Sequence, residues 1–176
     1  RAMTTLRRFR AADLFRFNNV NLDPFTETYS VAFYLQYLGR WPEYCRMALG
    51  PHGRCMGYLL GKAESFKTVA DSWHGHVTAV TVAPEARRLG LASHLMRILE
   101  RTSDADACLF VDLFVRPSNQ TAVAMYQGLG YVIYRTVLGY YSGEEDAYDM
   151  RKALARDPEG KTVVPLLAPV YPEDVE

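Results

Sequence analysis

Two segments of this 176-residue chain combine residue types that could hold the phosphates of a ligand. The first, residues 87–92, reads RRLGLA and stands directly before a stretch in which apolar residues recur at helical spacing. A helix that begins there would direct its unpaired N–H groups and the positive end of its dipole at an anion. Gly90 would let the backbone approach that anion closely. A solvated basic turn before an ordinary amphipathic helix has the same composition, so this segment alone decides nothing.

The second segment, residues 118–126, reads SNQTAVAMY. Asn119, Ala122 and Tyr126 are three and four residues apart, so in a helix they share one face. Ser118 or Asn119 would cap the start of that helix. Tyr126 would then present a phenol near the helix end, although a tyrosine at this spacing is more commonly a core aromatic whose hydroxyl reaches water.

The elements that must position these segments form a strand–helix–strand unit. Strands are predicted at 76–84 and 108–115, and each leads into one segment and then into a helix, at 91–102 and from about Asn119 to the glycines at 128–130. Strand-to-helix junctions are where α/β folds commonly bind phosphates. Further helices are predicted at 11–22 and 31–38, and further strands at 44–49, 55–62, 131–138 and 148–154. This order predicts one α/β domain over residues 3–154, followed by an extended, Pro-rich, acidic tail at 155–176.

The composition narrows the possible partners. Twenty basic and twenty acidic residues give zero formal net charge, which offers no electrostatic reason to expect direct nucleic-acid or membrane binding. Three widely spaced cysteines, Cys45, Cys55 and Cys108, do not resemble a disulfide framework and favour a reducing compartment. The HGH sequence at 74–76 has no third Cys or His nearby, so we predict no metal site.

Together, RRLGLA after one strand and N-x-x-A-x-x-x-Y after the next resemble the motifs of the GNAT family of N-acetyltransferases. The resemblance covers about residues 5–154. It implies a mixed central β-sheet flanked by helices, with acetyl-coenzyme A as the cosubstrate. It also implies that residues 87–92 hold the pyrophosphate, that the backbone of 80–82 pairs with the pantetheine arm, and that Tyr126 protonates the leaving thiolate. The coenzyme-binding residues it implies are Val80, Thr81, Val82, Arg87, Arg88, Gly90, Leu91, Ala92, Ser93, Asn119 and Tyr126.

A narrower resemblance is carried by NLDPFTETY at 21–29, WHGHVTA at 73–79 and AYDMRKAL at 147–154. These segments resemble the catalytic subunits of N-terminal acetyltransferase B (NatB) complexes, which acetylate the α-amine of nascent proteins beginning with Met followed by Asp, Glu, Asn or Gln. The resemblance implies a large helical auxiliary subunit that brings the enzyme to the ribosome, in the cytoplasm. The substrate-binding residues it implies are Glu27, Tyr29, His76, Thr78, Tyr140 and Tyr141.

This chemistry agrees with the residue types present. An α-amine has a pKa of about 7.7–8.0, against about 10.4 for lysine, so part of it is already neutral at pH 7. A weak base is therefore sufficient, and Glu27 and His76 are the candidates for that base or for binding the ammonium group. With Tyr126 as the acid, these complete the predicted catalytic set. Because no cysteine has an activating neighbour in sequence, we expect direct attack within a ternary complex.

Two other functions fit the same motifs. A related acetyltransferase could act on lysines or small amines, and a non-catalytic subunit could bind acyl-coenzyme A without using Tyr126 or His76. Structural roles also compete with functional ones. Glu27 could be an ordinary loop acid, and the tyrosines could form a partner interface. Asp112 could be catalytic, a buried, hydrogen-bonded carboxylate, or a residue on an edge that faces solvent.

Overall fold

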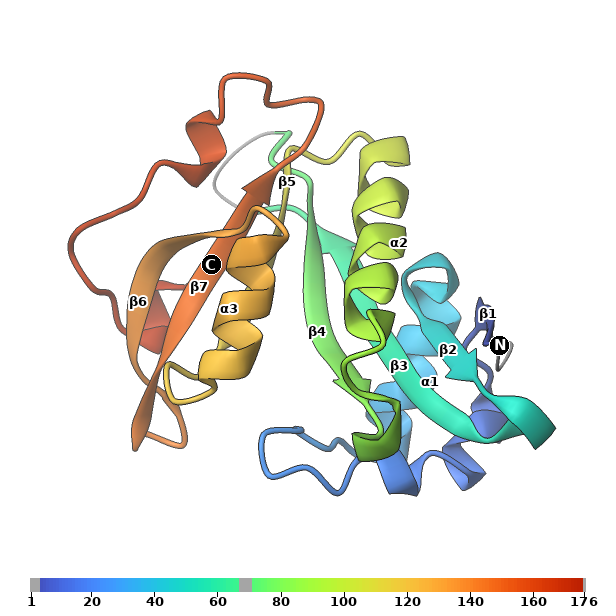
Figure 1. The fold of residues 1–176 in the computed structure, drawn as a ribbon. Coiled ribbons are helices and arrows are strands. Elements are labelled where there is room, and N and C mark those ends of the chain that lie inside the picture. The colour runs from blue at the N-terminus through green and yellow to red at the C-terminus, as the bar shows by residue number, and fades with distance from the viewer. Residues whose placement is uncertain (1–3, 67–70, 176) are drawn as a thin grey trace. The chain divides into compact units, whose positions relative to one another are not determined.

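The computed structural model describes residues 4–66 and 71–175, which divide into two compact units (Figure 1). The first unit extends to Lys62 and includes Val77–Thr102, and the second comprises Ala63–His76 and the chain from Ser103 onward. Strand β4 (His74–Val82) passes from the second unit into the first after His76. The predicted site residues are therefore divided between the two units.

The first unit contains strands in the order β1-β2-β3-β4. Strand β1 (Thr5–Arg8) pairs antiparallel with β2 (Arg46–Leu49), which pairs antiparallel with β3 (Cys55–Glu64). Helices α1 (Val31–Arg40) and α2 (Leu91–Ala105) flank these strands (Figure 1). The start of α1 is fixed by Ser30, whose side chain accepts a hydrogen bond from the Phe33 N–H at 3.3 Å.

Aromatic side chains form much of the core of the first unit. The rings of Phe9, Phe17, Tyr34 and Tyr58 pack with centroids 5.3–5.8 Å apart. Burial raises the pKa of the Tyr58 phenol, and its hydroxyl donates to Asn21 Oδ1 at 2.7 Å, which satisfies the polar end of the ring. Aliphatic residues from β2, β3 and the end of β4 complete this core, among them Met47, Leu60 and Val82.

The second unit is built on three antiparallel strands whose order in the sheet differs from their order in the chain. Strands β5 (Phe110–Val115), β7 (Glu145–Ala153) and β6 (Val132–Tyr141) are hydrogen-bonded in that order. The start of β4 precedes β5 in the same order, and the Leu109 N–H donates to the Trp73 carbonyl at 2.8 Å. Helix α3 (Gln120–Gly128) connects β5 to β6. The buried apolar residues of these strands include Phe110, Val111, Leu113, Val137, Ala147 and Met150.

The C-terminal tail follows the edge of β6. The Leu166 N–H donates to the Tyr134 carbonyl at 2.6 Å, and Val170 exchanges backbone hydrogen bonds with Thr136 and Leu138 at 3.0 and 2.8 Å. An isolated parallel bridge joins Val170 to Val137. These contacts cover polar backbone groups that an edge strand would otherwise expose.

Most predicted elements are confirmed with ends displaced by a few residues, but the predicted helix at 11–22 is wrong. The chain forms two 3-10 helices there, Ala11–Phe15 and Asn18–Val20. The Asp13 carboxylate accepts hydrogen bonds from the Arg10 N–H and from the Arg7 guanidinium, which stabilises a tight turn in place of an α-helix. The sequence also does not predict β1, because TLRR is too short and too charged to show strand periodicity.

Among the helices of residues 4–66 and 71–175, none has the length and apolar character that a membrane span requires.

Candidate active site

The RRLGLA segment contains the end of the loop between β4 and α2 and the first two residues of α2, in the first unit. After a 3-10 turn at Pro84–Ala86, Arg88 and Gly90 adopt φ angles of +64° and +75°. Glycine tolerates this left-handed conformation, and the Gly90 carbonyl accepts the first helical hydrogen bond, from the His94 N–H at 3.0 Å. The N–H groups of residues 91–93 precede that bond and so lack partners within the helix. They can donate to an anion bound at the helix start.

The two arginines of this loop have different surroundings. Arg87 donates from Nε to the Val82 carbonyl at 3.2 Å and forms an ion pair with Asp23. Arg88 is exposed, and its left-handed backbone is strained for a residue with a side chain. Such strain is often found at ligand sites. Arg88 is therefore the better candidate for direct contact with phosphate.

The β4 residues predicted to face the pantetheine arm are more buried than the loop. The Thr81 side chain is part of the core, because its hydroxyl is 3.0 Å from that of Thr26 and donates to the Val20 carbonyl at 3.3 Å. Val80 is half-buried and Val82 is buried. Thr81 and Val82 can therefore reach a ligand only through their backbone groups, as the predicted role requires.

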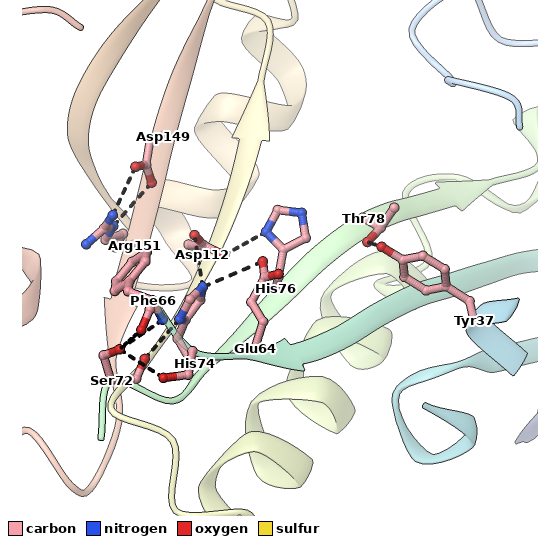
Figure 2. A network of polar contacts seen from close by, with 11 residues as sticks. Tyr37, Glu64, Phe66, Ser72, His74, His76, Thr78, Asp112, Asp149 and Arg151 are labelled. Carbon is pink, nitrogen blue, oxygen red and sulfur yellow. Dashed lines mark hydrogen bonds and ion pairs between the residues drawn. The ribbon is translucent and has the colours of Figure 1, made fainter. Parts of the chain in front are cut away.

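The first unit brings together two of the predicted substrate residues, Tyr29 and Thr78. The Tyr29 hydroxyl lies 3.5 Å from the Thr78 carbonyl, and the Thr78 hydroxyl donates to the Tyr37 hydroxyl at 2.9 Å (Figure 2). The Tyr29 ring also stacks on Phe33 of α1, with centroids 4.3 Å apart. Glu27 is exposed in the same loop, two residues before Tyr29. Tyr37 is an addition to the predicted set.

Helix α3 positions Asn119 and Tyr126 in the second unit. Asn119 is the N-cap, and its Oδ1 accepts from the Ala122 N–H at 3.3 Å. Tyr126 is buried and packs edge-on against Tyr131, with centroids 5.9 Å apart. Burial raises the pKa of the Tyr126 phenol, so the hydroxyl is protonated at neutral pH and can donate a hydrogen bond to a thiolate.

A row of rings joins three further predicted residues in the second unit. The His76 imidazole lies 5.9 Å from the Phe114 ring, which stacks on Tyr140 at 4.7 Å. Tyr140 in turn meets Tyr141 edge-on at 5.1 Å. The Arg116 guanidinium lies over the Tyr141 ring, 3.9 Å from its centroid, in a cation–π contact. The structure thus links His76 to Tyr140 through Phe114 and adds Arg116 beside Tyr141, and the sequence singled out neither Phe114 nor Arg116.

Glu145 connects this row to the start of α3. Its carboxylate accepts from Arg116 at 2.9 Å and from the Ser118 hydroxyl and N–H at 2.5 and 3.2 Å. The hydrogen bonds from Ser118 and Arg116 lower the pKa of the Glu145 carboxyl. Because Asn119 follows Ser118 directly, Glu145 also orients the helix start that carries Asn119.

The HGH sequence lies in a polar network beside β5 (Figure 2). His76 Nδ1 is 2.8 Å from Asp112 Oδ1. His74 is buried, its ring packs against those of Phe66 and Phe110, and its Nδ1 is 3.1 Å from the Ser72 carbonyl. Burial alone would lower the pKa of His74, but Glu64 and Asp112 together raise it above its ordinary value. Of the alternatives considered for Asp112, the structure shows a buried, hydrogen-bonded carboxylate.

A strand-spacing signal could have identified some of the missed residues. Phe114 and Arg116 stand two and four residues after Asp112, which is already a candidate from the sequence, so all three fall on the same side of one extended segment. Tyr37 and Glu145 have no such signal, because their contacts join segments far apart in sequence.

Two other kinds of chemistry would need a cysteine nucleophile or a bound metal ion. Burial raises the pKa of the Cys45 and Cys55 thiols to about 11, so neither is poised as a thiolate nucleophile at neutral pH. Within the described ranges, no group of three or more His, Cys, Asp or Glu side chains is arranged to hold a metal ion.

Residues 13–131 match the model of the Acetyltransferase (GNAT) family. The chain therefore belongs to this family, and the predicted α/β fold class, a mixed sheet flanked by helices, is confirmed.

More specific relatives agree with the narrower resemblance. The chain is 58% identical, over 99% of both sequences, to the Arabidopsis thaliana protein named N-terminal acetyltransferase B complex catalytic subunit NAA20. It is similar to the solved structure of Chaetomium thermophilum Naa20 in complex with a bisubstrate analogue, with a TM-score of 0.91 and 44% identity over 96% of this chain and 97% of that one. A chain of the NatB acetyltransferase complex bound to CoA and MES gives a TM-score of 0.78 and 42% identity, over 85% of this chain and 99% of that one. The predicted resemblance to NatB catalytic subunits is confirmed.

We expect the charge on His74 to make the stability of the fold depend on pH. The folded-state pKa of His74 is raised above the ordinary value of about 6.5. Its protonated form therefore contributes stability that is fully present below about pH 6.5 and is lost as the pH rises through the folded-state pKa. Urea denaturation should show that His74→Gln loses more free energy of unfolding at about pH 6 than at about pH 9.

His94→Gln is the matched control, since His94 is exposed on α2. The loss of unfolding free energy that His94→Gln causes should not be smaller at about pH 9 than at about pH 6. A His74→Gln loss that is equal at both, or larger at the higher pH, would contradict the assigned charge.

Proposed function

We propose that this chain is the catalytic subunit of a NatB-type enzyme that transfers acetyl from acetyl-coenzyme A to the α-amine of nascent proteins beginning Met-Asp, Met-Glu, Met-Asn or Met-Gln. The observation that carries the proposal is the 58% identity, over nearly the whole chain, to a NatB catalytic subunit. Solved relatives bound to CoA or to a bisubstrate analogue support the cosubstrate and a direct transfer between two bound substrates.

In this proposal the loop before α2 binds the coenzyme pyrophosphate. Arg88 supplies positive charge, and the N–H groups of residues 91–93 donate to phosphate oxygens. Arg87 assists while it retains its ion pair with Asp23. The backbone of residues 80–82 binds the pantetheine arm, and Asn119 also contacts the coenzyme. Tyr126, buried and protonated, stabilises and protonates the leaving thiolate.

The substrate residues act on the peptide's first two positions. Tyr29, Tyr140 and Tyr141 hold the amino end and its backbone, and Glu27 binds the ammonium group or removes its proton. Thr78 and His76 recognise the second side chain, where a hydroxyl and an imidazole can pair with either a carboxylate or an amide. Because the α-amine is partly neutral at pH 7, binding and alignment supply much of the rate.

An auxiliary subunit and the ribosome complete the proposed assembly. The first unit exposes a group of large apolar side chains from the N-terminal segment and α1: Phe15, Leu22, Phe25, Val31 and Leu35. Exposed apolar side chains in such number support a protein partner for this unit. The neutral net charge agrees with ribosome attachment through that partner, in the cytoplasm, and not through direct RNA contact.

The test is acetyl transfer from labelled acetyl-coenzyme A to four peptides, beginning Met-Asp, Met-Leu, Ser-Glu, or carrying only an internal lysine. The chain is assayed alone and with an auxiliary subunit. We expect transfer to the Met-Asp peptide at least about tenfold above the others, because one well-placed charge-assisted hydrogen bond discriminates by at least that factor. Preferred transfer to lysine would establish the lysine acetyltransferase, and coenzyme binding without transfer would establish the non-catalytic subunit.

Two substitutions separate coenzyme binding from chemistry. Arg88→Ala should raise the KM for acetyl-coenzyme A by about tenfold, because it removes a charged contact to phosphate. Tyr126→Phe should lower kcat by about a hundredfold with little change in that KM, because only the proton donor is lost. Steady-state kinetics on the Met-Asp peptide measures both effects.

Arg97→Ala is the control for removing a positive charge from the same region, since Arg97 is exposed on α2 beyond its first turn. It should keep both parameters close to those of the unaltered chain. The opposite pattern, with Arg88 affecting kcat and Tyr126 affecting KM, would refute the two roles.

A further inference from the structure

The Asp112 carboxylate lies between two imidazole rings in the second unit (Figure 2). Its Oδ1 is 2.8 Å from His76 Nδ1, and its Oδ2 is 3.9 Å from His74 Nε2. Asp112 is almost completely buried, whereas the His76 side chain keeps 15% of its surface exposed. Of the His76–Asp112 pair, the imidazole is therefore the member that a ligand can reach.

Several neighbours keep Asp112 ionised. Burial alone would raise the pKa of this carboxyl, but His76, His74 and Arg151 together lower it. The nearby anion on β7, Asp149, is itself paired with Arg135 at 2.8 Å and Arg151 at 3.2 Å. An ionised carboxylate can only accept hydrogen bonds, so the nitrogen that faces it, His76 Nδ1, must carry a proton.

The other side of Asp112 is held by His74. That ring packs against both Phe66 and Phe110, with centroids 4.6 and 4.8 Å away, and its Nδ1 is 3.1 Å from the Ser72 carbonyl. His74 Nε2 is directed at Asp112 and at Glu64, whose Oε1 lies 3.7 Å away. These contacts restrict rotation of the buried His74 ring, so it gives Asp112 a second imidazole neighbour besides His76.

We propose that Asp112 is a positioning residue that fixes the orientation and proton position of His76, so that Nε2 is the ring nitrogen presented to the second side chain of the peptide. This inference rests on the proposed function, in which His76 binds that side chain. With the Nδ1 proton committed to Asp112, Nε2 donates to a carboxylate when the ring is protonated. It accepts from an amide N–H when the ring is neutral. One fixed imidazole can therefore bind Asp, Glu, Asn and Gln, and it offers nothing to alanine.

A double-mutant cycle tests whether Asp112 acts through His76. The substitution Asp112→Asn keeps the side-chain shape and removes the charge. We expect it to lower the ratio of kcat/KM for Met-Asp over Met-Ala peptides by about tenfold, through a higher KM for the Met-Asp peptide. In a His76→Gln background the same substitution should change that ratio by less than about twofold, because the residue through which it acts is gone.

Asp13→Asn is the matched control. Asp13 is buried and paired with Arg7 at 2.7 Å, and its carboxylate accepts hydrogen bonds from the Arg7 guanidinium and the Arg10 N–H. A tenfold loss of preference in Asp13→Asn, or an equal loss from Asp112→Asn in both backgrounds, would overturn the inference, because either would indicate general destabilisation. If the unaltered enzyme shows no preference for Met-Asp, the proposed function fails, and that outcome is distinct from a preference that survives Asp112→Asn.

A second measurement needs no substitution at Asp112. Imidazole ¹⁵N spectra of the histidine-labelled chain, with His76→Gln used to assign the signal, report which ring nitrogen is protonated. We expect a proton on Nδ1 of His76 at every pH at which Asp112 is ionised. A neutral ring protonated only at Nε2 would overturn the inference even if Asp112→Asn failed to fold.

Discussion

A buried carboxylate must be matched by positive charge or hydrogen-bond donors, and in the second unit this requirement ties strands together. Asp112 on β5 is matched by His74 and His76 at the start of β4, and Asp149 on β7 by Arg135 and Arg151. Arg151 links the two sets, because it pairs with Asp149 and its charge also helps to lower the pKa of Asp112. Neither acid could be buried without its partners. The exposed edge of His76 is therefore held in place by a network whose primary role is to satisfy buried charge.

Some of the predicted coenzyme-binding side chains are engaged in contacts within the fold, whereas others remain available to a ligand. The Thr81 hydroxyl and the Asn119 carbonyl oxygen each have a structural partner within their own unit. Their proposed contributions to coenzyme binding therefore come from the Thr81 backbone and the Asn119 amide N–H groups. By contrast, Arg88 pairs an exposed side chain with a strained backbone, and Tyr126 keeps a protonated phenol in a buried position. Arg88 and Tyr126 are therefore the stronger candidates for direct contact with the coenzyme.

Local signals in the sequence predict most of the fold, because they depend on neighbouring residues. The β-branched run in β4, the periodic apolar face of α2 and the Asn cap of α3 are all readable from short windows. The segment at 11–22 has apolar residues at helical spacing, yet its conformation is set by the contact of Asp13 with Arg7, outside that window. Likewise, the pairing of His76 with Asp112 joins positions 36 residues apart. No periodicity encodes such contacts, so these pairings emerge only from the three-dimensional structure.

The central claim is that acetyl passes directly from coenzyme A to the α-amine of a bound peptide. The most direct measurement is the affinity, by isothermal titration calorimetry, of a bisubstrate analogue in which coenzyme A is joined through an acetyl linker to the α-amine of a Met-Asp peptide. We predict that this analogue binds at least about a hundredfold more tightly than coenzyme A alone, because it engages both substrate sites and approximates the transition state. Affinity equal to that of coenzyme A would mean that the chain does not hold the two substrates together, and would contradict the claim.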